Sequence, residues 1–401
     1  MNNLPEQTNV QINTDSTKKS GNSGVKAVAV ILAVVFCLFT AGLGLYGFFL
    51  PDRDFSESEN RVLSHKPVLT REGILNGSYM KEVESYLSDQ FPFRDGAISL
   101  KTFTDRIMGK REENGVYIGS DGFLFDFPAE YIKADNKKKL EVIDNFCNKY
   151  KGARQMLVLS PNSSYIYKEL LPYNVQLPDQ NKQINSIFRS LKSESLIKLN
   201  ATDSLLEAKK GGTQLFYKTD HHWTTRAAFS VFESISSQWG IKTKNYSFYP
   251  VTADFEGTLS GKAGISGTKD IIEICVPENA EGTYTVNYES KQLKTATLFD
   301  ESKLNQKNKY EIFVGGNFDK VAIDTVRQNE MSLLIVKDSY ANCMIPMLTP
   351  YFSKIVIVDP RYLTDSISAI MQETDFTHIL FLYNLNTFLT DTSIVPAFSE
   401  D

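Results

Sequence analysis

The pattern of hydrophobic and polar positions separates a short N-terminal segment from a long globular part. Residues 1–26 are rich in Asn, Gln, Ser, Thr and Gly, and this composition predicts a disordered tail. Residues 27–50 then run without a single charged side chain. Their number fits one membrane span, since about 20 apolar residues cross a bilayer core as a helix. We therefore expect a transmembrane helix over 27–50.

The charges on either side of this apolar run predict its orientation. Three lysines precede it and four acids follow it closely: Lys18, Lys19, Lys26, Asp52, Asp54, Glu57 and Glu59. The positive-inside rule then places the tail in the cytoplasm and the chain from Pro51 onward outside the cell membrane. A cleaved signal peptide is the alternative, but the run exceeds the usual 7–15-residue apolar region and no small-x-small site closes it. An uncleaved single-pass anchor is the prediction.

Residues 51–125 follow as a juxtamembrane region. Apolar residues recur at helical spacing over 79–87 and over about 98–108, so both stretches are predicted helices. Residues 116–125 alternate around a Ser-Asp-Gly turn, a pattern typical of a β-hairpin.

From residue 126 onward, apolar strand-like runs alternate with helical stripes. The predicted strands are 155–160, 196–199, 333–337, 354–358 and 378–383, and the predicted helices are 137–150, 181–191, 224–239, about 340 onward and 365–373. Strands separated by helices favour a mainly parallel sheet flanked by helices. Between about 245 and 329 the pattern changes to short alternating runs, including 284–288, 310–314 and 321–326, broken by Gly, Asn and Asp. We expect an α/β domain over 126–401 that carries a β-rich insertion at about 245–329.

Composition narrows the possible functions only a little. With 42% hydrophobic and 23% charged residues, the chain has the composition of an ordinary globular protein. A net charge of −5 gives no indication of a basic face that would bind nucleic acid. Of the four cysteines, Cys37 lies in the apolar run, and Cys147, Cys275 and Cys343 can form one disulfide at most. None of them has the spacing of a zinc site, so no metal or cofactor is predicted.

Ser339 is the candidate nucleophile. It comes just after the predicted strand 333–337 and just before a helix, and in open parallel sheets active groups gather at the carboxyl ends of strands. Free N–H groups at the start of a helix can stabilise an oxyanion beside its Oγ. The alternative is that Ser339 only caps the helix. Asp338 is expected to cap that helix or to tighten the turn.

The run Asp220-His221-His222-Trp223 supplies the partners that a serine nucleophile needs. His222 is the predicted base, and Asp220 would hold its other ring nitrogen and so fix the tautomer. His221 would point the other way, and Trp223 would pack beneath the site and exclude water. A structural turn is one alternative. The other alternative is that the two histidines form half of a metal site. Only His65 and His378 then remain as further histidine ligands.

Three further polar residues are candidates for substrate binding or for the oxyanion hole. Arg361 follows the strand 354–358 and could hold an anionic or oxygen-rich group, while Asn384 follows the strand 378–383 and could donate to an oxyanion. Tyr340 adjoins the candidate nucleophile. Each of the three has an alternative as a loop or turn residue.

These motifs together resemble the DHHW protein family, a relative of the periplasmic alginate O-acetyltransferases with their SGNH-hydrolase-like domain. The residues that carry the resemblance are Asp220-His221-His222-Trp223 and Lys337-Asp338-Ser339-Tyr340, supported by Asn60-Arg61, 87–95 and 115–119. The resemblance extends from about residue 55 to near the C-terminus. It implies Ser339 as nucleophile, His222 as base and Asp220 as its partner. His221 remains an alternative base, because the alginate enzymes carry one histidine in this motif.

The order of the motifs has a further implication. Aspartate and histidine precede the serine, the reverse of ordinary SGNH hydrolases, so a permuted topology is expected. Lys337 occupies the glycine position of the usual Gly-Asp-Ser run, and the oxyanion hole is therefore left unassigned.

The resemblance implies a membrane-anchored O-acetyltransferase that modifies a cell-surface polysaccharide outside the cell. Acetyl-CoA is not expected there, so a membrane-bound O-acyltransferase would be the acetyl donor. Two alternatives remain open: a carbohydrate esterase with the same triad, and a non-catalytic polysaccharide-binding subunit of an export and acetylation complex.

Overall fold

The computed structural model describes residues 21–59, 61–278 and 284–399. The chain divides into two compact units. One combines the chain up to Asp54 with Val62–Arg94, and the other combines Phe55–Arg61 with Asp95 onward.

The first unit contains α1 (Gly21–Phe49), α2 (Arg71–Asn76) and α3 (Ser78–Asp89). Within α1, Gly24–Phe49 has a mean hydropathy of 2.7 over its most apolar window. Among the described residues it is the one helix long and apolar enough to cross a membrane. This helix is compatible with the predicted single-pass anchor.

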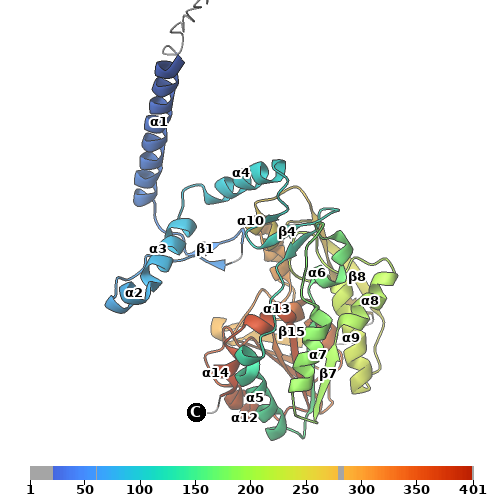
Figure 1. The fold of residues 1–401 in the computed structure, drawn as a ribbon. Coiled ribbons are helices and arrows are strands. Elements are labelled where there is room, and N and C mark those ends of the chain that lie inside the picture. Colours follow the sequence, from blue (N-terminus) through green and yellow to red (C-terminus); the bar gives the residue numbers. More distant parts are fainter. Residues whose placement is uncertain (1–20, 60, 279–283, 400–401) are drawn as a thin grey trace, which may run out of the picture. The chain divides into compact units, whose positions relative to one another are not determined.

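The second unit is built on an eight-stranded sheet with the strand order β11-β10-β12-β14-β13-β15-β6-β7. Strands β15 and β7 of this sheet are labelled in Figure 1. Strands β14, β13, β15, β6 and β7 are parallel, and the other three are antiparallel. The parallel strands are β6 (Arg154–Ser160), β7 (Leu196–Asn200), β13 (Ser332–Lys337), β14 (Lys354–Val358) and β15 (His378–Asn384). The predicted α/β architecture with a mainly parallel sheet is confirmed.

Helices cover both faces of this sheet, which explains why its central strands read as continuous apolar runs. On β13, Leu334 and Val336 face one core and Leu333 and Ile335 face the other. The first core also takes side chains from α5 (Lys133–Lys149), α7 (Gln180–Ser190), α12 (Ile367–Glu373), α13 (Leu385–Thr390) and α14 (Ile394–Phe398). The second takes side chains from α8 (Thr202–Lys210), α9 (Thr225–Trp239), η5 (Ser339–Cys343) and α11 (Ile345–Leu348).

The segment predicted as a β-rich insertion is β-rich, but it is not a separate body. β8 (Tyr246–Phe255) and β9 (Asp270–Pro277) form their own antiparallel pair. In contrast, the main sheet is extended by three strands of this segment, of which β12 is antiparallel to β14. These strands are β10 (Tyr284–Tyr288), β11 (Leu293–Thr295) and β12 (Lys320–Thr325).

The prediction of a strand at 310–314 is wrong. Residues Lys309–Ile312 form the 3₁₀ helix η4, and both Tyr310 and Ile312 are buried. Alternating apolar residues in a tight 3₁₀ turn resemble a short strand in sequence.

Of the remaining elements, the predicted hairpin is present as β4 and β5. The others are α4, the strands β1, β2 and β3, four short helical segments and α10. Their bounds are β1 (Phe55–Ser56), β2 (Arg61–Val62), α4 (Arg94–Ile107), β3 (Glu112–Glu113), β4 (Val116–Ile118), β5 (Leu124–Asp126), α6 (Ser163–Ile166), η1 (Lys168–Leu170), α10 (Thr258–Ala263), η2 (Glu289–Lys291) and η3 (Glu301–Asn305). All four cysteines are free thiols, and Cys147, Cys275 and Cys343 are buried.

Candidate active site

Ser339 lies at the carboxyl end of the central strand β13, at the first position of η5. Asp338 fixes this turn, since one carboxylate oxygen accepts from Tyr340 N at 2.9 Å and the other from Asn384 N at 2.8 Å. Asp338 is therefore the cap of the following helix, as predicted. The side chain of Ser339 itself stays partly open to solvent.

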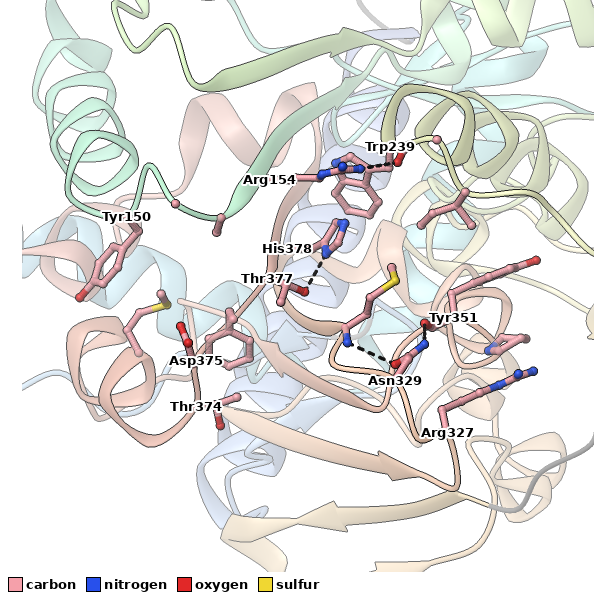
Figure 2. Close-up of a pocket in the computed structure, with 18 of the residues that line it drawn as sticks. Tyr150, Arg154, Trp239, Arg327, Asn329, Tyr351, Thr374, Asp375, Thr377 and His378 are labelled. Atoms are coloured by element: carbon pink, nitrogen blue, oxygen red, sulfur yellow. Dashed lines mark hydrogen bonds between the residues drawn. The ribbon is translucent and has the colours of Figure 1, made fainter.

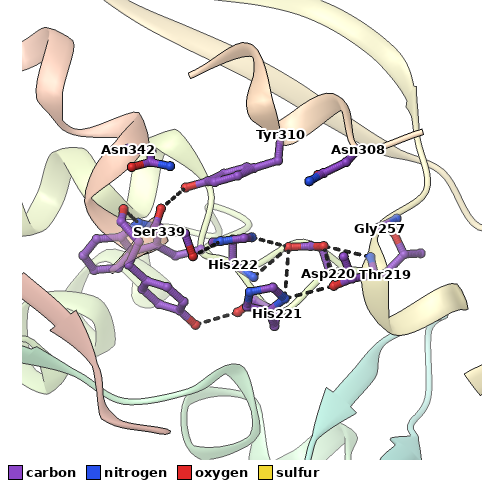
Figure 3. A network of polar contacts seen from close by, with 12 residues as sticks. Thr219, Asp220, His221, His222, Gly257, Asn308, Tyr310, Ser339 and Asn342 are labelled. Atoms are coloured by element: carbon purple, nitrogen blue, oxygen red, sulfur yellow. Dashed lines mark hydrogen bonds and ion pairs between the residues drawn. The ribbon is translucent and has the colours of Figure 1, made fainter. Parts of the chain in front are cut away.

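The structure brings Ser339, His222 and Asp220 into one hydrogen-bonded chain (Figure 3). Ser339 Oγ lies 2.7 Å from His222 Nε2, and His222 Nδ1 lies 2.5 Å from Asp220 Oδ1. A hydroxyl, a ring nitrogen and a carboxylate within hydrogen-bond reach have the geometry of a serine nucleophile with its base and orienting acid.

A tight loop before α9 presents the imidazole. The bridge between Phe216 and Trp223 closes this loop, and Tyr217 N donates to His222 O at 3.3 Å. Inside the loop, His222 N donates to Asp220 Oδ1 at 3.0 Å, so the acid holds both the backbone and the ring of its partner.

The expectation that His221 points away from His222 is wrong. The two rings lie side by side, with centroids 3.9 Å apart. An extended chain would send adjacent side chains to opposite faces, but the turn at Asp220 brings them to the same side. His221 Nδ1 lies 3.0 Å from Thr258 Oγ1, and this ring is the more exposed of the two.

The second carboxylate oxygen of Asp220 is held from the start of α10. Thr258 supplies its N–H at 2.9 Å and its hydroxyl at 3.0 Å. The neighbouring Gly257 allows this approach, because a Cβ at that position would lie 2.3 Å from the Cβ of Asp220. Nothing in the hydrophobic pattern indicated either residue.

Burial sets the protonation states of the pair. It lowers the pKa of His222 to about 4, helped by the nearby His221 and opposed by Asp220. Burial alone would raise the pKa of Asp220, but the two histidines and the bonds from His222 and Thr258 bring it well below its usual range. At neutral pH the site therefore holds a carboxylate and a neutral imidazole that can accept a proton.

Tyr310 completes the site from η4, and sequence reasoning missed it. Its ring stacks on the His222 imidazole with centroids 3.8 Å apart and an interplanar angle of 13°. Its hydroxyl donates to the backbone carbonyl of Ser339 at 3.1 Å (Figure 3). The apolar alternation around Tyr310 predicts a strand of the insertion, and nothing in that pattern connects Tyr310 to the base.

Trp223 and Tyr340 form a buried aromatic wall next to this chain. Trp223 Nε1 donates to Tyr340 O at 2.8 Å, and the Tyr340 hydroxyl donates to His221 O at 2.5 Å. Both rings are almost fully buried. The hydrogen bonds from their polar atoms hold the backbone on both sides of the site.

Arg361 also lies near the site, but it is already paired. Its guanidinium binds Asp359 at 2.8 and 2.6 Å, and Asp359 is also 3.3 Å from the buried Lys337 ammonium. Lys337 in turn donates to Asn317 Oδ1 at 2.8 Å. The positive charge of Arg361 lowers the pKa of Asp338, which burial nevertheless raises to about 6.

Asn384 is placed at the same edge of the sheet, at the end of β15. Its side-chain amide donates to Asn162 Oδ1 at 2.9 Å, and its Oδ1 accepts from Asn386 N at 2.9 Å. These bonds connect the ends of β15 and β6, and they cap α13.

The group Asp220, His221 and His222 also has ligand atoms within 4.8 Å of one another, as a metal site would require. Both ring nitrogens of His222 are engaged, however, by Asp220 and Ser339. His378 lies at the opposite end of the sheet, at the start of β15, so it cannot add a ligand.

Comparison with known proteins confirms the resemblance. Residues 178–358 match the family model described as DHHW protein. The chain is 25% identical over 177 residues to a probable alginate O-acetylase AlgJ of Pseudomonas fluorescens, which is 42% of this chain and 45% of that protein. A probable alginate O-acetylase AlgJ of Azotobacter vinelandii is 25% identical over 165 residues, 39% of this chain and 41% of that protein. The chain thus spans less than half the length of these curated relatives.

Two solved structures share the fold. A DHHW family protein from Eubacterium siraeum superimposes with a TM-score of 0.61 at 19% identity, covering 71% of this chain and 96% of the other. Bacillus cereus PatB1 with a sulfonyl adduct gives a TM-score of 0.57 at 16% identity, covering 68% and 97%. The chain therefore shares its fold with these two proteins over the parts that superimpose.

Proposed function

We propose that this chain is a membrane-anchored, extracytoplasmic O-acetyltransferase that acetylates hydroxyl groups of a cell-surface polysaccharide. The observation that carries the proposal is the chain from Ser339 through His222 to Asp220, at the carboxyl end of a central parallel strand. The relatives named alginate O-acetylase support acetyl transfer to a polysaccharide as the reaction. The sulfonyl adduct on the related PatB1 fold is in line with a covalent mechanism.

In the first half-reaction, Ser339 Oγ attacks the carbonyl carbon of an acetyl donor while His222 Nε2 takes the hydroxyl proton. The tetrahedral intermediate collapses to acetyl-Ser339, and the imidazolium gives its proton to the leaving group. Asp220 holds Nδ1–H throughout and stabilises the positive ring. In the second half-reaction a sugar hydroxyl loses its proton to His222 and attacks the acetyl-serine, and the proton then returns to Ser339 Oγ.

The backbone N–H of Ser339 is our candidate for the oxyanion donor. The neighbouring N–H groups are committed: Asp338 N to Leu382 O, Tyr340 N to the Asp338 carboxylate, and Ala341 N to Asp338 O. Within the described part of the chain, the N–H of Ser339 has no such partner. A donor on the nucleophile's own residue meets the developing charge as the bond forms.

The apolar helix α1 supports membrane anchoring, and the flanking charges support an outside location for the second unit. A membrane-bound O-acyltransferase is the proposed acetyl donor, because an anchor would keep the chain at the same membrane as such a donor.

The test uses the full chain in detergent with p-nitrophenyl acetate and peptide mass spectrometry. Acetylation of Ser339 is expected in the wild type, and it should be absent in Ser339→Ala and His222→Ala. It should be unchanged in Ser120→Ala, which replaces an exposed serine that has no hydrogen bond to Ser339, His222 or Asp220 within the described part of the chain. An added oligosaccharide should then leave with the acetyl group. Release of free acetate alone would favour the esterase. No adduct in a folded protein would favour a non-catalytic binding subunit.

A further inference from the structure

A large cavity lies at the opposite end of the parallel strands from Ser339. Figure 2 shows the side chains that line it, with Arg154, Trp239 and His378 labelled. Its volume is about 1120 Å³, and its wall includes Arg154 and His378 at the starts of β6 and β15. Pockets for small ligands span roughly 300–1,000 Å³, so this one can take a ligand of several rings. The six residues of β13 between the two edges amount to about 20 Å at 3.3 Å per residue.

Positive charge dominates the lining of this cavity, although the whole chain carries a net charge of −5. The charged side chains are five bases and one acid: Lys149, Arg154, Lys242, Lys244, Arg327 and Asp375. Within the described residues, no carboxylate forms an ion pair with Lys242, Lys244 or Arg327. These three bases, gathered in one concave site, favour an anionic ligand.

The wall also contains two buried polar atoms without partners. Trp239 is 2% exposed and His378 is 5% exposed, and within the described part of the chain neither Trp239 Nε1 nor His378 Nε2 has a hydrogen-bond partner. The two rings lie 5.0 Å apart, centroid to centroid, against the same wall of the cavity. Buried polar atoms of this kind are uncommon and point to a missing group.

The tautomer of His378 follows from its neighbour. The Thr377 hydroxyl donates to Ser332 O and accepts from Ser332 N, so it can only accept from His378 Nδ1, which lies 2.8 Å away. Burial and the charge of Arg154 lower the pKa of His378 to about 4, so the ring is neutral at pH 7. Nε2 is then an acceptor, while Trp239 Nε1 is a donor. A hydroxyl group, which both donates and accepts, matches this pair.

We propose that this cavity is a second binding site for a glycan that carries carboxylate or phosphate groups. Its bases take the anionic groups. The Trp239–His378 wall takes a sugar hydroxyl after a movement of these side chains, because Trp239 Nε1 and His378 Nε2 are both buried. The inference rests on the proposed function, because it specifies the chemical class of the acceptor polymer. It also gives that polymer a second contact about 20 Å from the acetylated serine. A polymer held at both ends of the sheet gains effective concentration at the reacting end.

Binding is measured by calorimetry on the full chain in detergent, with three probes of six units each: oligogalacturonate, oligo(glycerol phosphate) and neutral cellohexaose. At least one anionic probe is expected to bind, more weakly as salt rises, and the tighter of the two identifies the anionic group. Cellohexaose should bind at least tenfold more weakly. Failure of both anionic probes, or equal binding of the neutral one, would overturn the proposal.

Charge reversal locates the site. Lys242→Glu combined with Arg327→Glu should weaken anionic binding at least tenfold, while the matched reversal of the exposed Lys138 and Lys294 should change it less than twofold. Equal binding by both double variants would contradict the assignment. The result is separable from catalysis: Ser339→Ala should bind the anionic probe as the wild type does, and the Lys242/Arg327 variant should still form acetyl-Ser339 from p-nitrophenyl acetate.

Discussion

Tyr310 lies flat against His222, with ring centroids 3.8 Å apart and an interplanar angle of 13°. The stacked phenol covers one face of the imidazole, and its hydroxyl holds the carbonyl of Ser339 at 3.1 Å. One side chain therefore positions the candidate base and the candidate nucleophile together and keeps water from the ring.

Two substitutions of Tyr310 should separate the effects of its ring and of its hydroxyl. Tyr310→Phe keeps the ring and loses the bond to Ser339, and we expect a loss of about 1 kcal/mol, or roughly fivefold in kcat. Tyr310→Leu also removes the ring, so water reaches His222 and its pKa moves from about 4 towards the usual 6.5.

The acid limb of the pH–rate profile distinguishes these outcomes. It should stay near pH 4 in Tyr310→Phe and move upward in Tyr310→Leu, with circular dichroism as the control for folding. An unchanged limb in a folded Tyr310→Leu protein would show that the stacked ring does not control the base.

The sequence predicted the strand-end position of Ser339 and the Asp-x-His spacing, because both depend on local order along the chain. It also predicted the central strands, since their apolar runs are long and bounded by polar turns. The other contacts come from Gly257, Thr258 and Tyr310, which lie 35 to 88 residues after His222, and only tertiary packing brings them to the site. The wrong strand at 310–314 shows the same limit, because a short apolar alternation fits a 3₁₀ turn equally well.

Replacing Asp220 by asparagine should disable the base without removing its neighbours. Asparagine can offer an N–H to His222 Nδ1 and so favour the wrong tautomer, with Nε2 protonated towards Ser339. We expect kcat/KM for p-nitrophenyl acetate to fall by about 10⁴-fold, the scale of tautomer loss in serine triads. A fall below tenfold would mean that Asp220 does not orient the base.

The pH dependence of the wild type follows from the neutral imidazole. His222 acts as a base only when unprotonated, and burial holds its pKa at about 4. Acetyl-serine formation should therefore be near its plateau at pH 6 and lose half its rate near pH 4. A midpoint at or above pH 6 in rapid-mixing measurements would contradict the buried, neutral state of the ring.

Gly257 provides a steric test of the Asp220 position. In Gly257→Ala the new methyl group would meet the Asp220 Cβ at 2.3 Å and its Oδ2 at 2.5 Å, so the carboxylate must shift. We expect at least a hundredfold loss of kcat, because small displacements of catalytic groups are costly. The matched control is Gly96→Ala in α4, where nothing lies within 4 Å of the added carbon. Equal activity of the two variants would show that the loop absorbs the methyl group.

Lys337 and Asp359 form an almost fully buried ion pair under the site, and their coupling can be measured by a double-mutant cycle. Lys337→Met leaves Asp359 with Arg361 alone, and we expect the free energy of unfolding to fall by about 3 kcal/mol, as when one partner of a buried pair is removed. Asp359→Leu leaves the Lys337 ammonium uncompensated in a site where burial already lowers its pKa. The double variant removes both charges, so its cost should be clearly below the sum of the single costs.

Urea unfolding followed by the fluorescence of the buried Trp223 and Trp239 reports on this unit alone. Additive costs would show that the pair is not coupled.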